Sequence, residues 1–185
     1  MSELEKMING EFYKATDLKL VFLRDKASRI LNKYNKKVYH EYNLRNNILS
    51  KLINTKGNYI IKPPFFCDYG FNIYIGKNVM VNYNCTFLDV CKIEIGDNTL
   101  IGPNTGIYTA CHPVDKDDRL NGLEYGKSIK IGNNVWIGGN CTILPGVTIG
   151  DNTVIGAGSV VTKSIESNVV AYGNPCEVKR KIEKE

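Results

Sequence analysis

A hydrophobic period of six residues constrains the fold of this chain more than any other feature. A large aliphatic residue heads each of six consecutive hexads, at Ile131, Ile137, Ile143, Ile149, Ile155 and Val161. The same register occurs upstream in two shorter runs, at Ile75, Val81 and Phe87 and at Ile95, Ile101 and Ile107. A fixed internal period is the signature of a repeat architecture. Three hexads together can form one triangular turn, so we expect a parallel β-helix whose aliphatic hexad heads point inward.

The residues between the hexad heads favour the same architecture. Gly, Ala, Ser and Thr recur where the chain would turn a corner, and the density of Gly and Asn excludes a helix of 3.6-residue period. Stacked coils lie about 4.8 Å apart, so roughly five turns would make a prism about 20–25 Å tall. The period by itself leaves the handedness of the coils open.

Residues 1–57 are expected to form a helical cap. Ser2 and Glu5 have the spacing of a capping box, and Asp17 precedes an amphipathic segment that it can cap. A further helix is expected over residues 43–57. The first coil of a solenoid has an unpaired sheet edge, and amphipathic helices would cover it.

Residues 58–172 are expected to form the β-helix, with the coil register starting near Ile75 after an extended approach. Directly after His112 the register is interrupted by a polar segment, 113–128, which contains no hexad heads. We interpret it as an excursion loop, and long loops in compact domains are often functional. Residues 173–185 are expected to form a turn and a short basic helix.

Composition narrows the class of protein. A net charge of +5, without a basic run interleaved with aromatic residues, gives no indication of nucleic-acid binding. No apolar run approaches the length of a membrane-spanning helix, and the first ten residues lack the layout of a signal peptide. None of the six cysteines forms a CxxC pair, so we expect reduced cysteines and a cytoplasmic protein.

Two histidines are the first candidates for catalysis. His40 lies in a polar stretch between predicted helices and is interpreted as a solvated residue. His112 lies where the coil register stops, and the root of a loop on a rigid sheet holds a general base firmly while leaving it accessible. A local capping role is the alternative for His112. Cys111 is not expected to act with it, because adjacent residues of an extended chain point to opposite faces.

Several motifs make the chain resemble the maltose and galactoside O-acetyltransferase family. They are DYGFNIYIG, YTACHPVD, IGNNVWIGGN, LPGVTIGDN, GAGSVVTK and GNPCEV, and the leading EKMINGEFYKATD is similar to the family's N-terminal helical region. The match extends over essentially the whole chain. It implies a left-handed parallel β-helix, a homotrimer with active sites between adjacent subunits, and acetyl transfer from acetyl-CoA to a sugar hydroxyl.

The resemblance also assigns roles to individual residues. It implies that His112 is the catalytic base, which should be worth about 10²–10⁴-fold in rate. Asn82 would supply a donor to the tetrahedral oxyanion, with a corner Asn in left-handed geometry as the alternative. Asp17 and Asp68 match positions that line the acceptor pocket, although Asp17 can also cap its helix and some members have Ser at the position of Asp68. Apart from the resemblance, the position of Glu124 in the excursion loop makes it a candidate to orient His112, with an ordinary solvated surface residue as the alternative.

For acetyl-CoA the resemblance indicates one tryptophan and several small or basic residues. Trp136 occupies a hexad position normally held by a small residue, so it should point outward, against the pantetheine or at a trimer interface. The full set implied by the match is Trp136, Gly139, Ala157, Thr162, Lys163 and Arg180. The small residues would admit the pantetheine, and the basic ones would meet phosphate charges. Glu177 stands where some relatives carry Arg, with Lys179 or Lys181 as possible substitutes.

Three other functions use the same predicted coil. A zinc-dependent hydratase needs three histidine ligands, whereas only His112 lies on the coils, so we expect no metal. A serine or xenobiotic O-acetyltransferase would share the coil and the histidine, but the short N-terminal helices and YTACHPVD favour a sugar acceptor. A non-catalytic trimeric scaffold would need neither a histidine at the loop root nor CoA.

Overall fold

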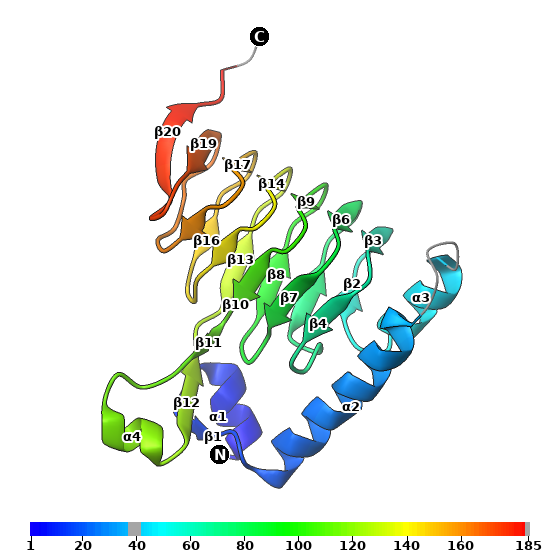
Figure 1. Cartoon of the computed structure of the whole chain (residues 1–185), viewed down its shortest axis with the longest axis vertical. Coiled ribbons are helices and arrows are strands. Elements are labelled where there is room, and N and C mark those ends of the chain that lie inside the picture. The colour runs from blue at the N-terminus through cyan, green and yellow to red at the C-terminus, as the bar shows by residue number, and fades with distance from the viewer. Residues whose placement is uncertain (37–41, 184–185) are drawn as a thin grey trace.

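The computed structural model describes residues 1–36 and 42–183, and the predicted His40 lies outside the described residues. The chain begins with four elements that precede the coils: α1 (Glu3–Asn9), β1 (Tyr13–Lys14), α2 (Leu18–Asn35) and α3 (Tyr42–Leu49). Short strands then follow one another around a three-sided prism, and Figure 1 shows the coils stacked between these helices and the C-terminal strand.

Each side of the prism is a parallel sheet to which successive coils contribute one strand. Face 1 contains β2 (Asn54–Thr55), β5 (Ile73–Ile75), β8 (Ile93–Ile95), β13 (Ile129–Ile131) and β16 (Thr148–Ile149). Face 2 contains β3 (Tyr59–Ile61), β6 (Val79–Val81), β9 (Leu100–Ile101), β14 (Trp136–Ile137), β17 (Val154–Ile155) and β19 (Val169–Tyr172). Face 3 contains β4 (Phe65–Cys67), β7 (Cys85–Leu88), β10 (Gly106–Tyr108), β15 (Thr142–Ile143) and β18 (Val160–Val161).

The hexad heads form the interior, as the period predicts. Ile137 is in register with Ile101 below and Ile155 above, and none of the three is exposed to solvent. The six parallel strands of face 2 show that the solenoid is one coil longer than the five turns expected. The extra coil comes from residues 54–67, so the predicted start of the coils near Ile75 and the boundary at residue 57 are wrong.

Asparagines turn the chain at the corner between faces 1 and 2. Asn78 and Asn98 both adopt the left-handed backbone conformation (φ 56°), and their side chains are joined by a 3.1 Å hydrogen bond between coils. Asn134 continues the same column with a 3.2 Å bond from Asn98. Asn tolerates positive φ better than other residues with a Cβ, and its amide can link to an identical neighbour. The Asn-rich repeat therefore specifies the corners as well as the period.

The helical cap covers the first coil. Ser2 and Glu5 form the predicted capping box, and Asp17 caps α2. The hydroxyl of Tyr34 donates to the carbonyl of Ile61, and Asn35 exchanges two hydrogen bonds with the Phe65 backbone (2.9 and 3.0 Å). These bonds satisfy backbone groups that a bare edge would leave unpaired. The second predicted helix, over residues 43–57, ends earlier, at Leu49.

The excursion loop has structure of its own. Residues 113–128 contain α4 (Lys116–Leu120) and β12 (Leu123–Gly126), which pairs on one side with β1 and on the other with β11 (Ala110–Cys111). Figure 1 shows this small three-stranded sheet beside α1, with α4 projecting from the prism. The excursion loop is thereby tied to the N-terminal segment.

The C-terminal segment differs from the prediction. Residues 177–181 form a strand, β20 (Glu177–Lys181), and not a short basic helix. β20 pairs antiparallel with β19 and closes the last edge of face 2. An open edge presents a row of unpaired backbone groups, and their pairing outweighs the helical preference of a Lys- and Arg-rich segment. No helix among the described residues is long and apolar enough to cross a membrane.

Candidate active site

The predicted site residues fall into two groups on different corners of the prism. We call the corner between faces 2 and 3 the 2–3 corner, and the corner between faces 3 and 1 the 3–1 corner. Face 2, its terminal strand and the 2–3 corner hold Asn82, Trp136, Gly139, Ala157 and Arg180. The 3–1 corner and its excursion loop hold Asp68, His112, Glu124, Thr162 and Lys163.

A groove of about 450 Å³ brings four of the first group together, because Asn82, Trp136, Gly139 and Ala157 all line it. Trp136 is 57% exposed, which confirms that it points outward. The floor of the groove is backbone, since a Cβ built on Gly138 would lie 2.5 Å from the Ala157 nitrogen. A groove with an indole wall and a backbone floor suits an elongated ligand that carries amide groups.

Asn82 has an amide group oriented for donation. Its side-chain oxygen accepts the backbone N–H of Tyr83 at 2.9 Å. Among the described residues no acceptor bonds its Nδ2 group, which leaves that group able to donate. Left-handed backbone geometry is found at Asn84 (φ 59°) and not at Asn82, so the corner alternative for Asn82 does not hold.

His112 lies at the end of the small three-stranded sheet, where it is exposed. The strands pair Ala110 with Gly126 and Cys111 with Tyr125, so the register continued by one residue sets His112 opposite Glu124. Directly opposed residues of an antiparallel pair present their side chains on the same face. The pairing therefore supports the hypothesis that Glu124 orients His112.

Tyr13 completes a row across this sheet. It pairs with Glu124 from β1, and its buried hydroxyl donates to Glu124 Oε2 at 2.8 Å. Burial, together with this bond to a carboxylate, raises the pKa of Tyr13 far above its usual value. The phenol is thus a fixed neutral donor, and the row Tyr13–Glu124–His112 has the order of orienting group, carboxylate and base.

Asp68 faces the same row from the prism. Burial raises the pKa of its carboxyl group to about 6, with Arg24 opposing the rise and Glu124 adding to it. Within the described residues no hydrogen bond or ion pair ends on this carboxylate. Arg24 instead donates to the hydroxyl of Tyr69 (2.6 Å) and to the carbonyl of Ala15 (2.7 Å). A mostly buried carboxylate with a free acceptor is suited to a hydroxyl-bearing ligand.

Sequence reasoning missed three members of this cluster: Tyr13, Arg24 and Tyr69. Tyr13 and Tyr69 lie within two of the quoted motifs, EKMINGEFYKATD and DYGFNIYIG, and Arg24 lies in none. Nothing in the spacing singles out the three residues, because they come together only when the N-terminal segment folds against the 3–1 corner. Asp17, which was predicted to line the acceptor pocket, accepts the backbone N–H groups of Lys19 and Leu20 at 3.0 and 3.2 Å. Its helix-cap role is confirmed, and no contact in the described chain joins its carboxylate to Asp68.

The remaining predicted residues are exposed basic and hydroxyl groups. Thr162 and Lys163 lie at the 3–1 corner near the C-terminal end of the coils. Arg180 lies on β20, opposite Val170 of face 2. Glu177 pairs with Lys179 (Nζ–Oε2 3.0 Å), so part of the positive charge of this strand is offset.

Asn82 and His112 do not meet within one chain. Asn82 follows a strand of face 2, whereas His112 follows a strand of face 3, so a side of the prism lies between their corners. About six residues cross that side, which corresponds to roughly 20 Å of extended chain. The two halves of the predicted site therefore lie apart within one chain.

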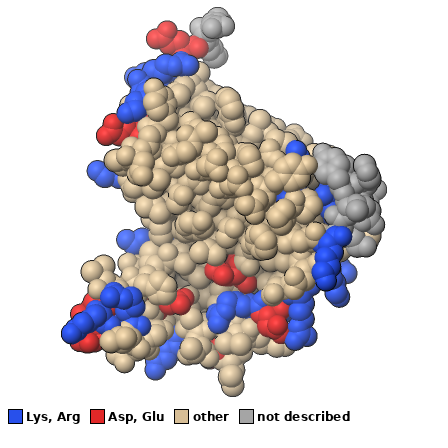
Figure 2. Space-filling view, viewed as in Figure 1, with Lys and Arg blue, Asp and Glu red and all other residues tan. Residues whose placement is uncertain are grey.

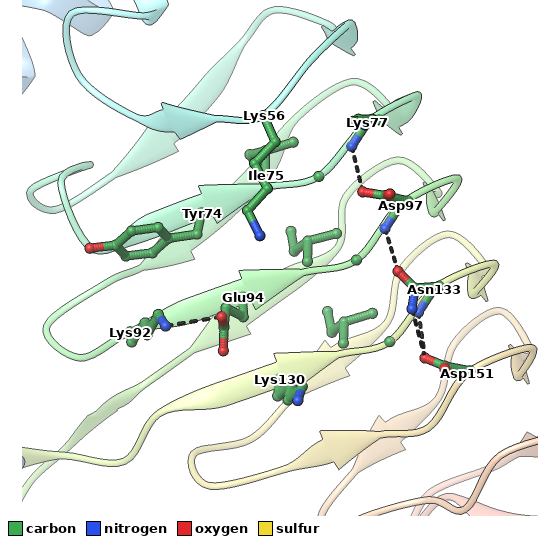
Figure 3. Close-up of a pocket in the computed structure, with 15 residues that line it drawn as sticks. Lys56, Tyr74, Ile75, Lys77, Lys92, Glu94, Asp97, Lys130, Asn133 and Asp151 are labelled. Carbon is green, nitrogen blue, oxygen red and sulfur yellow. Dashed lines mark hydrogen bonds and ion pairs between the residues drawn. The ribbon is translucent and has the colours of Figure 1, made fainter.

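Figure 3 shows a second hollow, of about 660 Å³, on face 1. Lys92 pairs there with Glu94 (2.9 Å). Asp97 and Asp151 accept backbone N–H groups of the preceding coil at 2.8 and 2.7 Å. Its carboxylates thus serve the fold, and no predicted site residue lies in it. In the described part of the chain no three His, Cys, Asp or Glu side chains converge as metal ligands.

Two family models match the chain. Residues 128–163 match the bacterial transferase hexapeptide of six repeats, and residues 6–57 match the maltose acetyltransferase hexapeptide capping motif. The first match falls on the uninterrupted hexads and the second on the helical cap.

Relatives and solved structures agree with these matches. The galactoside O-acetyltransferase of Lactococcus lactis is 42% identical, over 98% of this chain and 89% of that protein. The Escherichia coli galactoside O-acetyltransferase is 46% identical, over 86% of this chain and 79% of that protein. Among structures, a maltose O-acetyltransferase from Clostridium difficile superposes with a TM-score of 0.97 at 52% identity, covering 100% and 99% of the two chains. A galactoside acetyltransferase in complex with coenzyme A has a TM-score of 0.94 at 41% identity, covering 99% and 92%.

Proposed function

This chain belongs to the maltose and galactoside O-acetyltransferase family of hexapeptide-repeat proteins, and on that premise we propose that it transfers an acetyl group from acetyl-CoA to a sugar hydroxyl, with His112 as general base. The observation that carries the proposal is the row Tyr13–Glu124–His112 beside the free carboxylate of Asp68. In the row, Glu124 would orient the His112 base. The Asp68 carboxylate would accept hydrogen bonds from the hydroxyl groups of a polyol.

The chemical step is a direct acyl transfer. His112 removes the proton from the sugar hydroxyl as its oxygen bonds to the thioester carbonyl carbon. The carbonyl becomes an oxyanion, and the free Nδ2 group of Asn82 donates to it. Collapse of the tetrahedral intermediate re-forms the carbonyl and breaks the carbon–sulfur bond. The CoA thiolate then takes the proton held by His112, which regenerates the neutral base.

The groove on face 2 is the proposed site for the CoA chain. Trp136 would lie along the pantetheine, and Gly139 and Ala157 would let its amides approach the backbone. Arg180, on the terminal strand of face 2, would meet the CoA phosphates with its positive charge. Lys163 lies at the 3–1 corner and would do so from a facing copy of the chain. A structure of a related galactoside acetyltransferase contains coenzyme A, and that of a hexapeptide-repeat-containing acetyltransferase from Vibrio cholerae, 36% identical to this chain, contains acetyl coenzyme A.

A homotrimer would bring the two halves of the site together. Face 2 carries a row of apolar side chains in register, without a charged residue, formed by Ile60, Met80, Leu100, Trp136, Val154 and Val170. Figure 2 shows the coil surface turned to the viewer almost free of charged side chains, with charge gathered at the two ends. Extended apolar surfaces of this kind mark protein–protein contacts. In a cyclic assembly the 2–3 corner of one copy can face the 3–1 corner of the next.

The charged groups near His112 favour a polyol over the alternatives. Arg24 and Glu124 both act electrostatically on Asp68, and this group of charged hydrogen-bonding side chains would suit several hydroxyls and disfavour an aromatic xenobiotic. Serine is the closer competitor, since Arg24 would attract its carboxylate. All six cysteines are unpaired, in keeping with a cytoplasmic enzyme.

The test is release of free CoA thiol from acetyl-CoA in the presence of maltose, glucose, a galactoside, serine or chloramphenicol. We expect thiol release that depends on a sugar. Thiol release with serine or chloramphenicol, and with none of the sugars, would identify that compound as the acceptor. If a folded trimer releases no thiol in response to any of these acceptors, the proposed acetyltransferase activity is contradicted and the non-catalytic scaffold is favoured.

A further inference from the structure

A buried carboxylate holds the segment that carries Asp68. Asp89 follows β7 at the 3–1 corner, and none of its surface is exposed. Its Oδ1 accepts the backbone N–H groups of Asp68 (3.1 Å) and Tyr69 (2.8 Å), and its Oδ2 accepts that of Asn72 (3.3 Å). No cation pairs with Asp89 within the described residues. All three of these hydrogen-bond donors are backbone N–H groups of a single turn.

The same turn returns two hydrogen bonds. The Nδ2 group of Asn72 donates to the carbonyls of Asp89 (2.8 Å) and Val90 (3.1 Å), and Asn72 is itself buried. The side chains of Asp89 and Asn72 thus bind each other's backbone. We call this reciprocal arrangement the Asp89–Asn72 clamp.

The next coil is tied to the clamp from the other side. The hydroxyl of Thr109, also fully buried, donates to the carbonyl of Leu88 (2.7 Å) and accepts the N–H of Cys91 (3.0 Å). Thr109 begins the segment that leads through β11 to His112. Three consecutive coils are therefore joined at this corner, with Asp68 on the first and His112 on the third.

The 3–1 corner does not need a buried carboxylate in order to turn. Two coils beyond Asp89, the turn over residues 144–147 is closed by a plain backbone bond from Val147 to Leu144 (3.4 Å). A buried carboxylate costs more free energy than a neutral group. It is suited to this turn because both of its oxygens are acceptors, whereas an Asn amide would set an N–H₂ group against a backbone N–H. The buried carboxylate is therefore needed for the turn that contains Asp68, and not for the corner in general.

We propose that Asp89 is a positioning residue for acceptor binding, which fixes the turn over residues 68–72 so that the Asp68 carboxylate and the Tyr69 hydroxyl face the acceptor. The inference rests on the proposed function, because it concerns the acceptor half of that site. Tyr69 receives the hydrogen bond of Arg24, so a displaced turn would disturb both a carboxylate and a guanidinium. The groove on face 2 lies on another corner and would be unaffected.

The test is steady-state kinetics of Asp89→Asn in the trimer, with sugar and acetyl-CoA varied in turn. We expect the KM for the sugar to rise about tenfold, the effect of roughly one lost charged hydrogen bond, while the KM for acetyl-CoA stays unchanged. Thr99→Val is the matched control. It removes an equally buried hydrogen bond, from Thr99 to Gly132 (3.0 Å), at the corner between faces 1 and 2, and should leave both constants unchanged.

A second variant covers the case in which Asp89→Asn does not fold. Asn72→Ala removes the two returning bonds of the clamp and should raise the KM for the sugar in the same selective way. The proposal is overturned if the variants lose thermal stability with unchanged KM for the sugar, or if both KM values rise together. Failure of the proposed function would show differently, as wild-type protein without sugar-dependent thiol release.

Discussion

The hydroxyl of Tyr13 donates a 2.8 Å hydrogen bond to the carboxylate of Glu124. Tyr13 belongs to the N-terminal segment, whereas Glu124 belongs to the excursion loop and lies opposite His112 in the continued strand register. The helical cap therefore has a second role besides covering the first coil. It fixes the carboxylate that we propose as the orienting group for His112.

Tyr13→Phe should lower kcat by about three- to tenfold, the usual effect of one neutral hydrogen bond, because Glu124 loses its fixed donor. Acetyl-CoA binding should be unchanged, since its groove lies on another corner. Tyr59→Phe is the matched control, as its buried hydroxyl bonds the Asn46 carbonyl (3.3 Å) away from the site. Equal kcat values for both variants would contradict a role for the Tyr13 bond in catalysis.

Mixed trimers test whether the site lies between copies. His112→Ala and Asn82→Ala chains should each be nearly inactive alone. When the two are unfolded and refolded together in equal amounts, one interface in four should combine an intact histidine with an intact asparagine. We expect the mixture to regain about a quarter of wild-type activity, measured as thiol release. Absence of recovery in verified mixed trimers would place both residues in one chain's site.

Ile137→Ala should lower the free energy of unfolding by about 2–5 kcal/mol, because it opens a cavity between Ile101 and Ile155 in the interior. The measurement is equilibrium denaturation in urea. Turnover by the folded variant at low temperature should stay close to wild type. A loss below 1 kcal/mol would show that the hexad heads are not the main source of stability.

The free energy of unfolding should depend on pH through the carboxylates of Asp89 and Asp68 at the 3–1 corner. Burial raises the pKa of Asp89 to about 7 and that of Asp68 to about 6, against values near 4 in an unfolded chain. Between these limits the folded chain binds more protons than the unfolded chain, so stability falls as pH rises from about 4 to about 7. Denaturation of Asp89→Asn across this range should show a smaller slope. A slope identical to wild type would contradict the raised pKa of Asp89.

The period of the hexads was enough to predict the prism, because each inward aliphatic repeats one local geometry. The family motifs identified His112, Asp68, Trp136 and Gly139 as candidates, and its position in the excursion loop identified Glu124. The structure brings His112, Glu124 and Asp68 to one corner and Trp136 and Gly139 into one groove. These residues lie inside or beside the repeat, where sequence position determines spatial position.

Other features depend on contacts between distant segments. Arg24 and Tyr13 reach the acceptor site through packing of the cap against the 3–1 corner, and Asp89 reaches it through hydrogen bonds between neighbouring coils. These contacts leave no trace in local spacing. β20 is a strand because it meets an open edge, although its composition favours a helix. Residues 54–67 likewise join the solenoid by pairing with the strands of the next coil, although their aromatic residues and prolines hide the hexads.

The central claim is that His112 is the general base of a sugar acetyltransferase. The most direct measurement is sugar-dependent thiol release by His112→Ala, with trimer assembly and acetyl-CoA binding checked on the same preparation. The account predicts a loss of about 10²–10⁴-fold in kcat with assembly and acetyl-CoA binding retained. Turnover within a few-fold of wild type would contradict it.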